Sequence, residues 1–206
     1  MKKLAVFASG SGSNFEAIVT AIREEKITGA EVVLLVCDKP QAAVLARAER
    51  LAIPVLLLDP KSFPDKAAYE AEIVKKLREL HVELIVLAGY MRLVGETLLS
   101  SYEAKIINLH PSLLPAFPGK AAIAQALHYG VKVTGVTVHF VDVGMDTGPI
   151  IAQKPVALEP ADTEETLAAR IHQEEHALLI KVIQDLVNGR LHLHGRVVTT
   201  DTAKTP

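Results

Sequence analysis

Two patterns of apolar residues alternate along the first half of the chain. Short runs that are apolar at nearly every position predict strands buried on both faces, and they span residues 4–8, 31–37, 53–59 and 82–88. Between these runs, apolar residues recur at intervals of three and four, which is the spacing of one face of an α-helix. Strands that alternate with helices in this order predict a parallel sheet covered by helices on both faces.

Local signals place the three helices between these strands. The first has an apolar stripe from Phe15 to Ile22, and the second spans about residues 41–52. Ser62 to Asp65 resembles a capping box, with Asp in the place of the usual Glu, and predicts the start of the third helix.

The pattern changes after Asn108. A short helix is predicted over residues 120–129, because Gly130 suits the position just past a helix end. Residues 133–142 alternate like a half-buried strand, which suggests mixed strand direction, and residues 149–156 predict a further strand.

The last part of the chain predicts a long helix and a hairpin. Asp162-x-x-Glu165 is typical of a helix start, and Asn188-Gly189 of its end. The remaining residues predict a small hairpin and a loose tail. We therefore expect one α/β domain with an open, mostly parallel twisted sheet, helices on both faces, and mixed strand direction toward the C-terminal half.

Composition narrows the class of protein. The chain has 206 residues, half of them hydrophobic, and a formal net charge of −2, which argues against a nucleic-acid partner. Its one cysteine, Cys37, cannot form an intramolecular disulfide, which fits a reducing compartment. The apolar run near the N-terminus is too short for a signal peptide, and no run is long enough to span a membrane. We therefore expect a soluble cytoplasmic protein with no membrane partner.

The turn after the first expected strand has the sequence SGSGSN (residues 9–14). Ligands of open α/β sheets bind beyond the carboxyl ends of strands, and free N–H groups at a helix start suit a phosphate. Two of the glycines begin a dinucleotide-binding fingerprint, with Asp38 as its ribose-binding acid, but Phe15 replaces the third glycine. The hydroxyl and amide groups suit a terminal phosphate monoester better. The alternative is a flexible turn in which Asn14 caps the helix.

The sequence HQEEH (residues 172–176) matches the inverted zinc-protease motif, H-x-x-E-H. A zinc site would need a further carboxylate ligand, and the chain after this motif offers only Asp185 and Asp201. Glu175 lies on the apolar stripe of the long helix, where a carboxylate needs a partner or a ligand. The simpler alternative is a pairing of Glu175 with Arg170 or another neighbour.

A third set of polar residues suits acid–base chemistry. Asn108 and His110 end an apolar run, and Asp146 lies in a later glycine-containing loop. An amide donor, an imidazole and a carboxylate together suit a site that stabilises an oxyanion and moves protons. Ser112 has no second base near it, so the residues favour direct transfer between two substrates over covalent catalysis. The alternative is a capped turn in which these polar residues are incidental. His139, inside the expected strand 133–142, is interpreted either as a structural histidine with its hydrogen bonds satisfied or as a partner of these three residues.

Two long motifs resemble a known family. NLHPSLLP with a following FPG, and GVTVHFVDVGMDTGPIIAQ, resemble the formyltransferases that use 10-formyltetrahydrofolate. SGSGSN and LAGYMRL add a resemblance to the branch that acts on glycinamide ribonucleotide (GAR). The resemblance covers residues 3 to about 192. It implies a Rossmann-like formyltransferase fold in which residues 1–100 bind phosphate, residues 101–190 carry catalysis and folate binding, and residues 191–206 are the hairpin and tail.

The resemblance also implies roles for individual residues. The phosphate of GAR would bind Gly12, Ser13 and Asn14, and Glu175 would contact the same substrate. Lys66 stands where related enzymes can have arginine. Its ammonium group keeps the positive charge but lacks the two parallel N–H donors of a guanidinium group. The implied folate-binding residues are Lys66, Met91, Arg92, Leu93, Val94, Asn108 and Asp142.

The implied reaction is formyl transfer from 10-formyltetrahydrofolate to the glycinamide amine of GAR, a step of de novo purine biosynthesis. Asn108 and protonated His110 would stabilise the tetrahedral oxyanion, while Asp146 would orient His110 and help to relay a proton. The folate is expected as a co-substrate without any metal, and the chain as a monomer or a homodimer. The prolines after His110 would hold the donors in place, and the Leu114–Pro115 bond is expected to be cis.

Other functions share parts of this pattern. Methionyl-tRNA formyltransferase and formyltetrahydrofolate hydrolase resemble the chain around the same Asn-His-Asp set, but each normally has a further domain, for which we expect no room in 206 residues. A nucleotide-binding module without catalysis would leave this set incidental. Formyl transfer from folate to GAR separates these alternatives.

Overall fold

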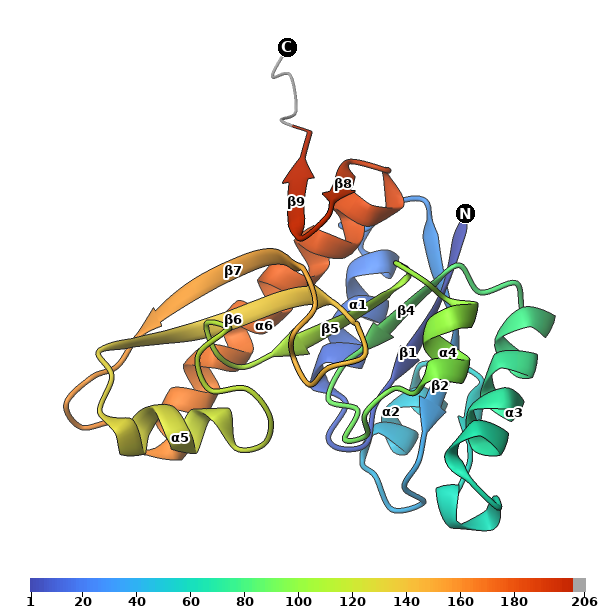
Figure 1. Cartoon of the computed structure of the whole chain (residues 1–206), viewed down its shortest axis with the longest axis horizontal. Helices are drawn as coiled ribbons and strands as arrows, with labels where there is room; N and C mark the ends of the chain where they lie inside the picture. Colours follow the sequence, from blue (N-terminus) through green and yellow to red (C-terminus); the bar gives the residue numbers. More distant parts are fainter. Residues whose placement is uncertain (202–206) are drawn as a thin grey trace.

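The computed structural model describes residues 1–201, which form a seven-stranded sheet and a separate two-stranded hairpin (Figure 1). The sheet has the strand order β3-β2-β1-β4-β5-β6-β7. Its strands are β1 (Lys2–Phe7), β2 (Ala30–Cys37), β3 (Val55–Leu57), β4 (Leu84–Leu87), β5 (Ile106–His110), β6 (Val133–Phe140) and β7 (Ile150–Ala157). The first five strands pair in parallel, whereas β6 is antiparallel to both β5 and β7. The predicted change to mixed direction is confirmed.

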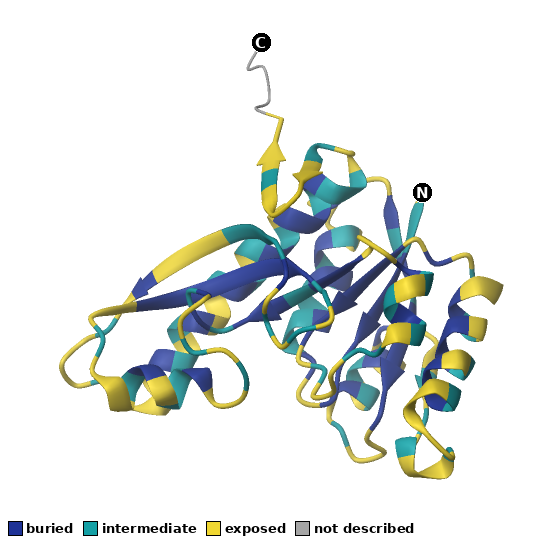
Figure 2. Ribbon diagram, in the orientation of Figure 1, coloured by how far each residue is buried: buried dark blue, intermediate teal, exposed yellow. Residues whose placement is uncertain are grey.

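Helices cover both faces of this sheet. They are α1 (Ser13–Arg23), α2 (Val44–Arg50), the 3-10 turn η1 (Pro60–Ser62), α3 (Lys66–Glu79), α4 (Glu96–Ser101), α5 (Ala122–Tyr129) and α6 (Glu164–Val187). One hydrophobic cluster joins the sheet to α1, α2 and α6, and a second joins it to α3 and α4. The central strands β1, β2, β4, β5 and β6 are accordingly mostly buried, whereas the outward helix faces and much of β7 are exposed (Figure 2).

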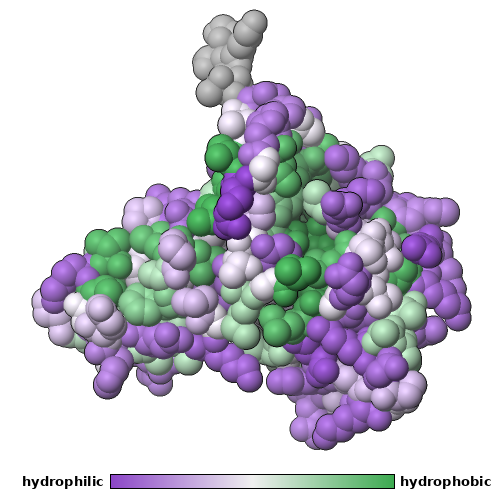
Figure 3. Space-filling view, in the orientation of Figure 1, coloured by the Kyte–Doolittle hydropathy of each residue, from purple (hydrophilic) through white to green (hydrophobic). Residues whose placement is uncertain are grey.

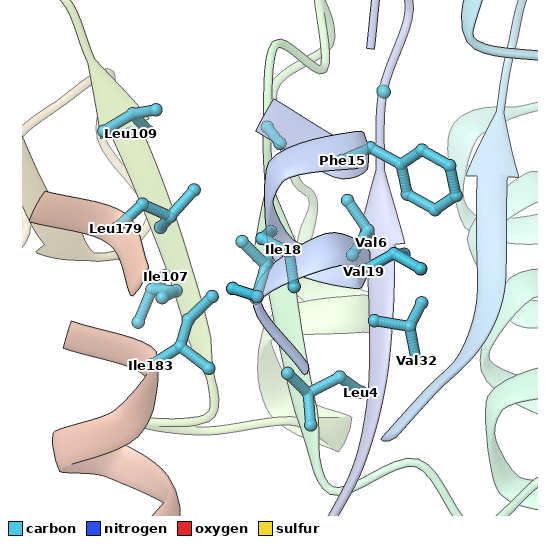
Figure 4. Packing of buried hydrophobic residues seen from close by; sticks show 14 of the residues in the cluster. Leu4, Val6, Phe15, Ile18, Val19, Val32, Ile107, Leu109, Leu179 and Ile183 are labelled. Atoms are coloured by element: carbon cyan, nitrogen blue, oxygen red, sulfur yellow. The ribbon is translucent and has the colours of Figure 1, made fainter. Parts of the chain in front are cut away.

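Side chains from distant segments interlock in the larger cluster. Figure 4 shows Val6 of β1 beside Val19 of α1, and Ile107 of β5 beside Ile183 of α6. All four are almost completely buried, and burying such a side chain contributes about 1.5–3 kcal/mol. This packing fixes α1 and α6 against the same face of the sheet, so their ends can share one site.

Two strands differ from their predictions. β3 is shorter than residues 53–59, and Val55 and Leu57 are 40% and 42% exposed, because this run forms the edge of the sheet and has a neighbour on one side only. The half-buried character expected for residues 133–142 is also wrong, since every residue of β6 after Val133 is buried. Its Thr137 is paired inside the molecule, since its hydroxyl donates to the carbonyl of Ser112 (2.7 Å) and accepts from the amide of Leu114 (3.0 Å).

Two predicted helix starts need correction. Asp65, not Ser62, caps α3, and its carboxylate accepts from the amide of Ala68 (2.8 Å). Thr163 caps α6 and forms a capping box with Thr166. The Asp162 carboxylate accepts from the Thr166 hydroxyl and pairs with Arg170. In both cases the capping side chain belongs to a polar residue near the predicted cap, because that side chain can accept a hydrogen bond from a free N–H group at the helix start.

The C-terminal hairpin consists of β8 (Leu191–His194) and β9 (Val197–Thr200), as predicted. The loose tail predicted after it falls on residues 202–206, which lie outside the described residues. Within residues 1–201, no helix combines the length and the hydrophobicity needed to cross a membrane. The division of the chain at residue 100 stays a prediction.

Candidate active site

The carboxyl ends of β1, β4 and β5 open into a cavity of about 590 Å3. Loops that follow these strands form most of its wall, as expected for an open α/β sheet. The loop between β6 and β7 folds back over β5, and α6 closes the remaining side. The lining residues come from segments 10–14, 87–94, 108–111, 119–123 and 139–146, with Glu164, His172 and Glu175 of α6.

Gly12 shapes the turn between β1 and α1. It has the left-handed φ of 77°, and a Cβ at this position would lie 2.4 Å from Cγ2 of Val44. α1 begins at Ser13 directly after it, so first-turn N–H groups, which lack partners within a helix, border the cavity. This arrangement suits a small anion.

Asn14 does not cap α1, contrary to one alternative drawn from the sequence. No side-chain cap exists at this helix, and Nδ2 of Asn14 instead donates to Oε2 of Glu175 (3.1 Å). The same oxygen accepts from Nδ1 of His172 (2.8 Å). Glu175 is only 4% exposed, and the pairing with Arg170 is wrong because Arg170 binds Asp162. The carboxylate therefore joins α6 to the start of α1.

The pKa values of the two histidines beside Glu175 move in opposite directions. The hydrogen bond to Glu175 raises the pKa of His172 above its ordinary value, since the carboxylate favours the charged imidazole. Burial lowers the pKa of His176. Within residues 1–201, no three His, Cys, Asp or Glu side chains are placed to share a metal ion, so the zinc motif lacks its third ligand.

Asn108, His110 and Asp146 converge at the centre of the cavity. Nδ1 of His110 lies 3.3 Å from Oδ2 of Asp146, and Nδ2 of Asn108 lies 3.3 Å from Oδ1 of the same carboxylate. The amide of Gly119 donates to Oδ2 of Asp146 (2.7 Å). Asp146 has a φ of 57°, a strained conformation for a residue other than glycine, which is typical of functional sites held by their surroundings.

The surroundings of Asp146 favour its ionised form. Burial raises the pKa of this carboxyl, but polar contacts with His139 and the Gly119 amide, together with the nearby His110, outweigh burial. The net pKa lies below the ordinary value for Asp. Asp146 is therefore a carboxylate, able to accept hydrogen bonds and to stabilise a cation beside it.

Two histidines are fixed by backbone carbonyls. Nε2 of His110 donates to the carbonyl of Phe117 (2.8 Å), so each of its ring nitrogens faces an oxygen that can only accept. Nδ1 of His139 donates to the carbonyl of Phe140 (2.7 Å), which turns Nε2 toward Nδ2 of Asn108 (3.2 Å). His139 thus supports the polar set, one of the two roles expected for it. Ser112 is completely buried and donates to the carbonyl of Ala116.

The proline-rich segment after His110 folds back on that histidine. Its Leu114–Pro115 peptide bond is cis, as the family resemblance implies. Phe117 and Gly119, further along, supply the carbonyl and the amide that hold His110 and Asp146. These two backbone groups were not found from the sequence, because only the course of the chain brings them to the site. His172 was noted only as part of the zinc motif.

The residues expected to bind folate line the cavity, with one exception. Met91 and Leu93 are 62% and 53% exposed, and Asp142 accepts from the amide of Gly144 and the hydroxyl of Thr147. The members of this set that line the cavity are Met91, Arg92, Leu93, Val94, Asn108 and Asp142. Lys66, the first residue of α3, is not among the lining residues.

Hydrophobic residues gather near the centre of the face shown in Figure 3, around the loop between β6 and β7. Val143 and Met145 of this loop are 82% and 47% exposed. An apolar rim around a polar interior suits a ligand that has a flat, partly apolar ring system.

Comparisons with known proteins find relatives of this chain. Residues 2–183 match a family model described as Formyl transferase. The chain is 60% identical to the phosphoribosylglycinamide formyltransferase of Bacillus subtilis over 187 residues, which cover 91% of this chain and 95% of that protein. It is 42% identical to the trifunctional purine biosynthetic protein adenosine-3 of Drosophila melanogaster, covering 91% of this chain but 14% of that protein.

A solved structure has the same fold. The crystal structure of glycinamide ribonucleotide transformylase 1 from Symbiobacterium toebii superposes with a TM-score of 0.94 at 44% sequence identity. The match covers 97% of this chain and 94% of that one. The cavity therefore belongs to a fold that this chain shares with that solved structure over nearly the whole length of both chains.

Proposed function

The chain belongs to the formyl transferase family, and we propose that it transfers the formyl group of 10-formyltetrahydrofolate to the amine of GAR, in de novo purine biosynthesis. The observation that carries this proposal is the convergence of Asn108, His110 and Asp146 in one cavity with the α1 turn and Glu175. An anion site and an acid–base set in one cavity suit a phosphorylated amine as acceptor.

GAR occupies the side of the cavity formed by α1 and α6. Its phosphate binds the backbone N–H groups of Gly12, Ser13 and Asn14, where the helix dipole also favours negative charge. Glu175 contacts the sugar or the glycinamide, since its carboxylate accepts from neutral donors. Oδ1 of Asn14 is buried without a partner among the described residues, and it offers a further acceptor for this substrate.

The folate occupies the other side. Arg92, Leu93 and Val94 offer backbone groups to the pteridine ring, and Asp142 belongs to the loop that faces them. The apolar side chains at the mouth of the cavity cover the ring system. The formyl group then lies beside Asn108, between the two substrates. The contact of Lys66 with the folate, outside the cavity lining, stays a prediction.

The chemistry is direct acyl transfer. The glycinamide nitrogen attacks the formyl carbon, and the carbonyl oxygen becomes the tetrahedral oxyanion. Asn108 and His110 donate to this oxyanion; removal of such a donor in other enzymes costs about a hundred- to a thousand-fold in kcat. Nδ1 of His110, rather than Nε2, donates to the oxyanion, because its 3.3 Å contact with Asp146 is longer than the 2.8 Å contact of Nε2 with the Phe117 carbonyl. When Nδ1 donates to the oxyanion, Asp146 still accepts from the amide of Gly119.

Collapse of the intermediate breaks the bond between the formyl carbon and N10 of the folate. The attacking amine loses one proton, and N10 gains one, so tetrahydrofolate leaves as a neutral amine. Asp146 orients His110 and helps to pass this proton through water. Because N–H donors stabilise the developing charge, the reaction we assign needs no metal ion.

A direct assay tests the function. Purified protein is mixed with GAR and 10-formyltetrahydrofolate, and both tetrahydrofolate release and formyl-GAR are measured. We expect release that depends on GAR, with one formyl-GAR formed for each tetrahydrofolate. Release at the same rate without GAR would indicate a hydrolase, and no release at all would contradict the proposal.

A further inference from the structure

The loop that joins β4 to α4, residues 89–95, is held by side chains that lie outside the cavity. Met91 and Leu93 of this loop project into the cavity mouth, whereas Ser9, Asp38 and Glu70 do not line it. These three residues are all at least nine-tenths buried. They contact the loop at its start and at its end.

Ser9 holds the start of the loop through two hydrogen bonds. Its amide donates to the carbonyl of Gly89 (3.0 Å), and its Oγ accepts from the amide of Met91 (2.9 Å). The Ser9 hydroxyl donates in turn to Oδ1 of Asp38 (2.6 Å). A hydroxyl has only one hydrogen, so its commitment to Asp38 leaves a lone pair directed at Met91. Asp38 therefore sets the orientation of the group that binds the loop.

Asp38 also contacts the loop through Arg92. Oδ2 of Asp38 lies 3.9 Å from the Arg92 guanidinium, which lies 5.7 Å from the centre of the Tyr69 ring. The Tyr69 hydroxyl is hydrogen-bonded to that of Tyr90 (2.7 Å). Residues on both sides of Met91 are thus fixed by contacts to Asp38, which directly follows β2, and to α3.

Glu70 of α3 holds the end of the loop. Its carboxylate accepts from the amide of Gly95 (2.6 Å) and from the amide of Leu98 (3.2 Å), which are free N–H groups at the start of α4. α4 has no capping side chain of its own at Gly95. A Cβ at Gly95 would lie 2.8 Å from Oε2 of Glu70, so a larger residue here would displace the carboxylate from the start of α4.

We propose that Asp38 and Glu70 are positioning residues for folate binding: two buried carboxylates that hold the 89–95 loop in the conformation that receives the co-substrate. The proposal rests on the function proposed above for this loop. It also explains why Asp38, which stands where a dinucleotide-binding protein has its ribose-binding acid, is buried against Ser9. Both carboxylates act through other groups and touch neither substrate.

The test compares Michaelis constants for the two substrates in Ser9→Ala, Asp38→Asn and Glu70→Gln. Ser9→Ala leaves the Met91 amide without its acceptor, and we expect the KM for 10-formyltetrahydrofolate to rise about tenfold. Asp38→Asn keeps an acceptor for Ser9 and loses only the charge, so its rise is smaller. Glu70→Gln loses one of two acceptors at the α4 start and behaves similarly. In all three, the KM for GAR and kcat stay within about twofold of the wild type.

The matched control is Asp185→Asn. Asp185 is also a buried carboxylate, paired with Lys181 and Arg190, but it lies outside the cavity lining. We expect this variant to lose thermal stability without changing either KM. A folate KM that changes equally in the control and in the loop variants would show a general effect of destabilisation and overturn the inference.

The remaining outcomes also decide the question. Folded variants with an unchanged folate KM, or with parallel changes in both KM values, would overturn the inference while wild-type activity still supports the function. An inactive wild type would defeat the function itself. If Ser9→Ala does not fold, Asp38→Asn decides, because it replaces one oxygen by nitrogen without changing shape.

Discussion

Asn14 and Glu175 are 161 positions apart in the chain, yet the side-chain amide of Asn14 donates to Oε2 of Glu175 over 3.1 Å. The contact joins the first turn of α1 to the middle of α6 at the wall of the cavity. Glu175 is buried, and both its partners, Asn14 and His172, are donors. One carboxylate thus joins two helices on the side of the cavity where we propose that GAR binds.

Glu175→Gln should weaken GAR binding. Glutamine has one acceptor oxygen and an NH2 group, and the NH2 group would face a donor on Asn14 or His172. We expect the KM for GAR to rise about tenfold, the loss of roughly one hydrogen bond to a charged group. Steady-state kinetics with each substrate varied in turn checks this. A raised KM for 10-formyltetrahydrofolate with an unchanged KM for GAR would show that Glu175 acts on folate binding and not on GAR binding.

His172 should titrate above the ordinary histidine pKa of about 6.5. Because the pKa of His172 is higher in the folded protein than in the unfolded chain, its contact with Glu175 contributes its full stabilisation at pH values below the unfolded pKa. That stabilisation is lost as the pH rises through the folded pKa. NMR titration of the imidazole measures the value directly. In Glu175→Gln the pKa should fall toward 6.5, and an unchanged pKa would contradict the assigned cause.

Gly12→Ala should damage the turn between β1 and α1, where we propose that the phosphate of GAR binds. The added Cβ would lie 2.4 Å from Cγ2 of Val44, and φ is 77°, so strain and overpacking together should cost about 2–4 kcal/mol in unfolding free energy. Chemical denaturation measures this loss. Val44→Ala in the same chain should recover only part of it, because the second change removes the contact with Cγ2 but leaves Cβ of residue 44 at 2.6 Å and the strained φ. No recovery would mean that the contact with Cγ2 of Val44 contributes nothing to the loss.

Asp146→Asn should reduce kcat by about a hundred-fold or more while leaving GAR binding nearly intact. The amide cannot stabilise a charged His110 or move a proton. Because the wild-type pKa of Asp146 is lowered, the carboxylate stays ionised until the pH falls through that pKa, below about 3.8. A pH profile of kcat should therefore show no loss from Asp146 between pH 5 and 8, and near-normal kcat in the variant would remove Asp146 from the mechanism.

Much of the fold follows from the hydrophobic pattern. The alternation of apolar runs and helical stripes predicts the parallel half, and the rule that ligands bind at strand carboxyl ends brings residues 9–14 and Asn108 together. The pattern fails at β6, where buried Thr137 and His139 read as exposed positions. Thr137 pairs with Ser112 and Leu114, and Nε2 of His139 faces Asn108; the sequence connects neither segment to this strand.

The site was predicted less completely than the fold. Side chains with evident chemistry, Asn108, His110 and Asp146, were found because amide, imidazole and carboxylate groups are recognisable in a sequence. The carbonyl of Phe117 and the amide of Gly119 were missed, because backbone groups carry no residue-type signal and depend on the course of the chain. Asn14 was missed as a partner of Glu175, because the two residues lie 161 positions apart in the chain.

The most direct test of the account is kcat for formyl transfer in wild type and His110→Ala, measured with GAR and 10-formyltetrahydrofolate at saturation. His110→Ala removes an oxyanion donor and the imidazole that Asp146 orients, so we expect kcat to fall about a hundred- to a thousand-fold. The dissociation constant for GAR, measured by calorimetry, should change by less than about twofold. A kcat close to the wild-type value would contradict the account.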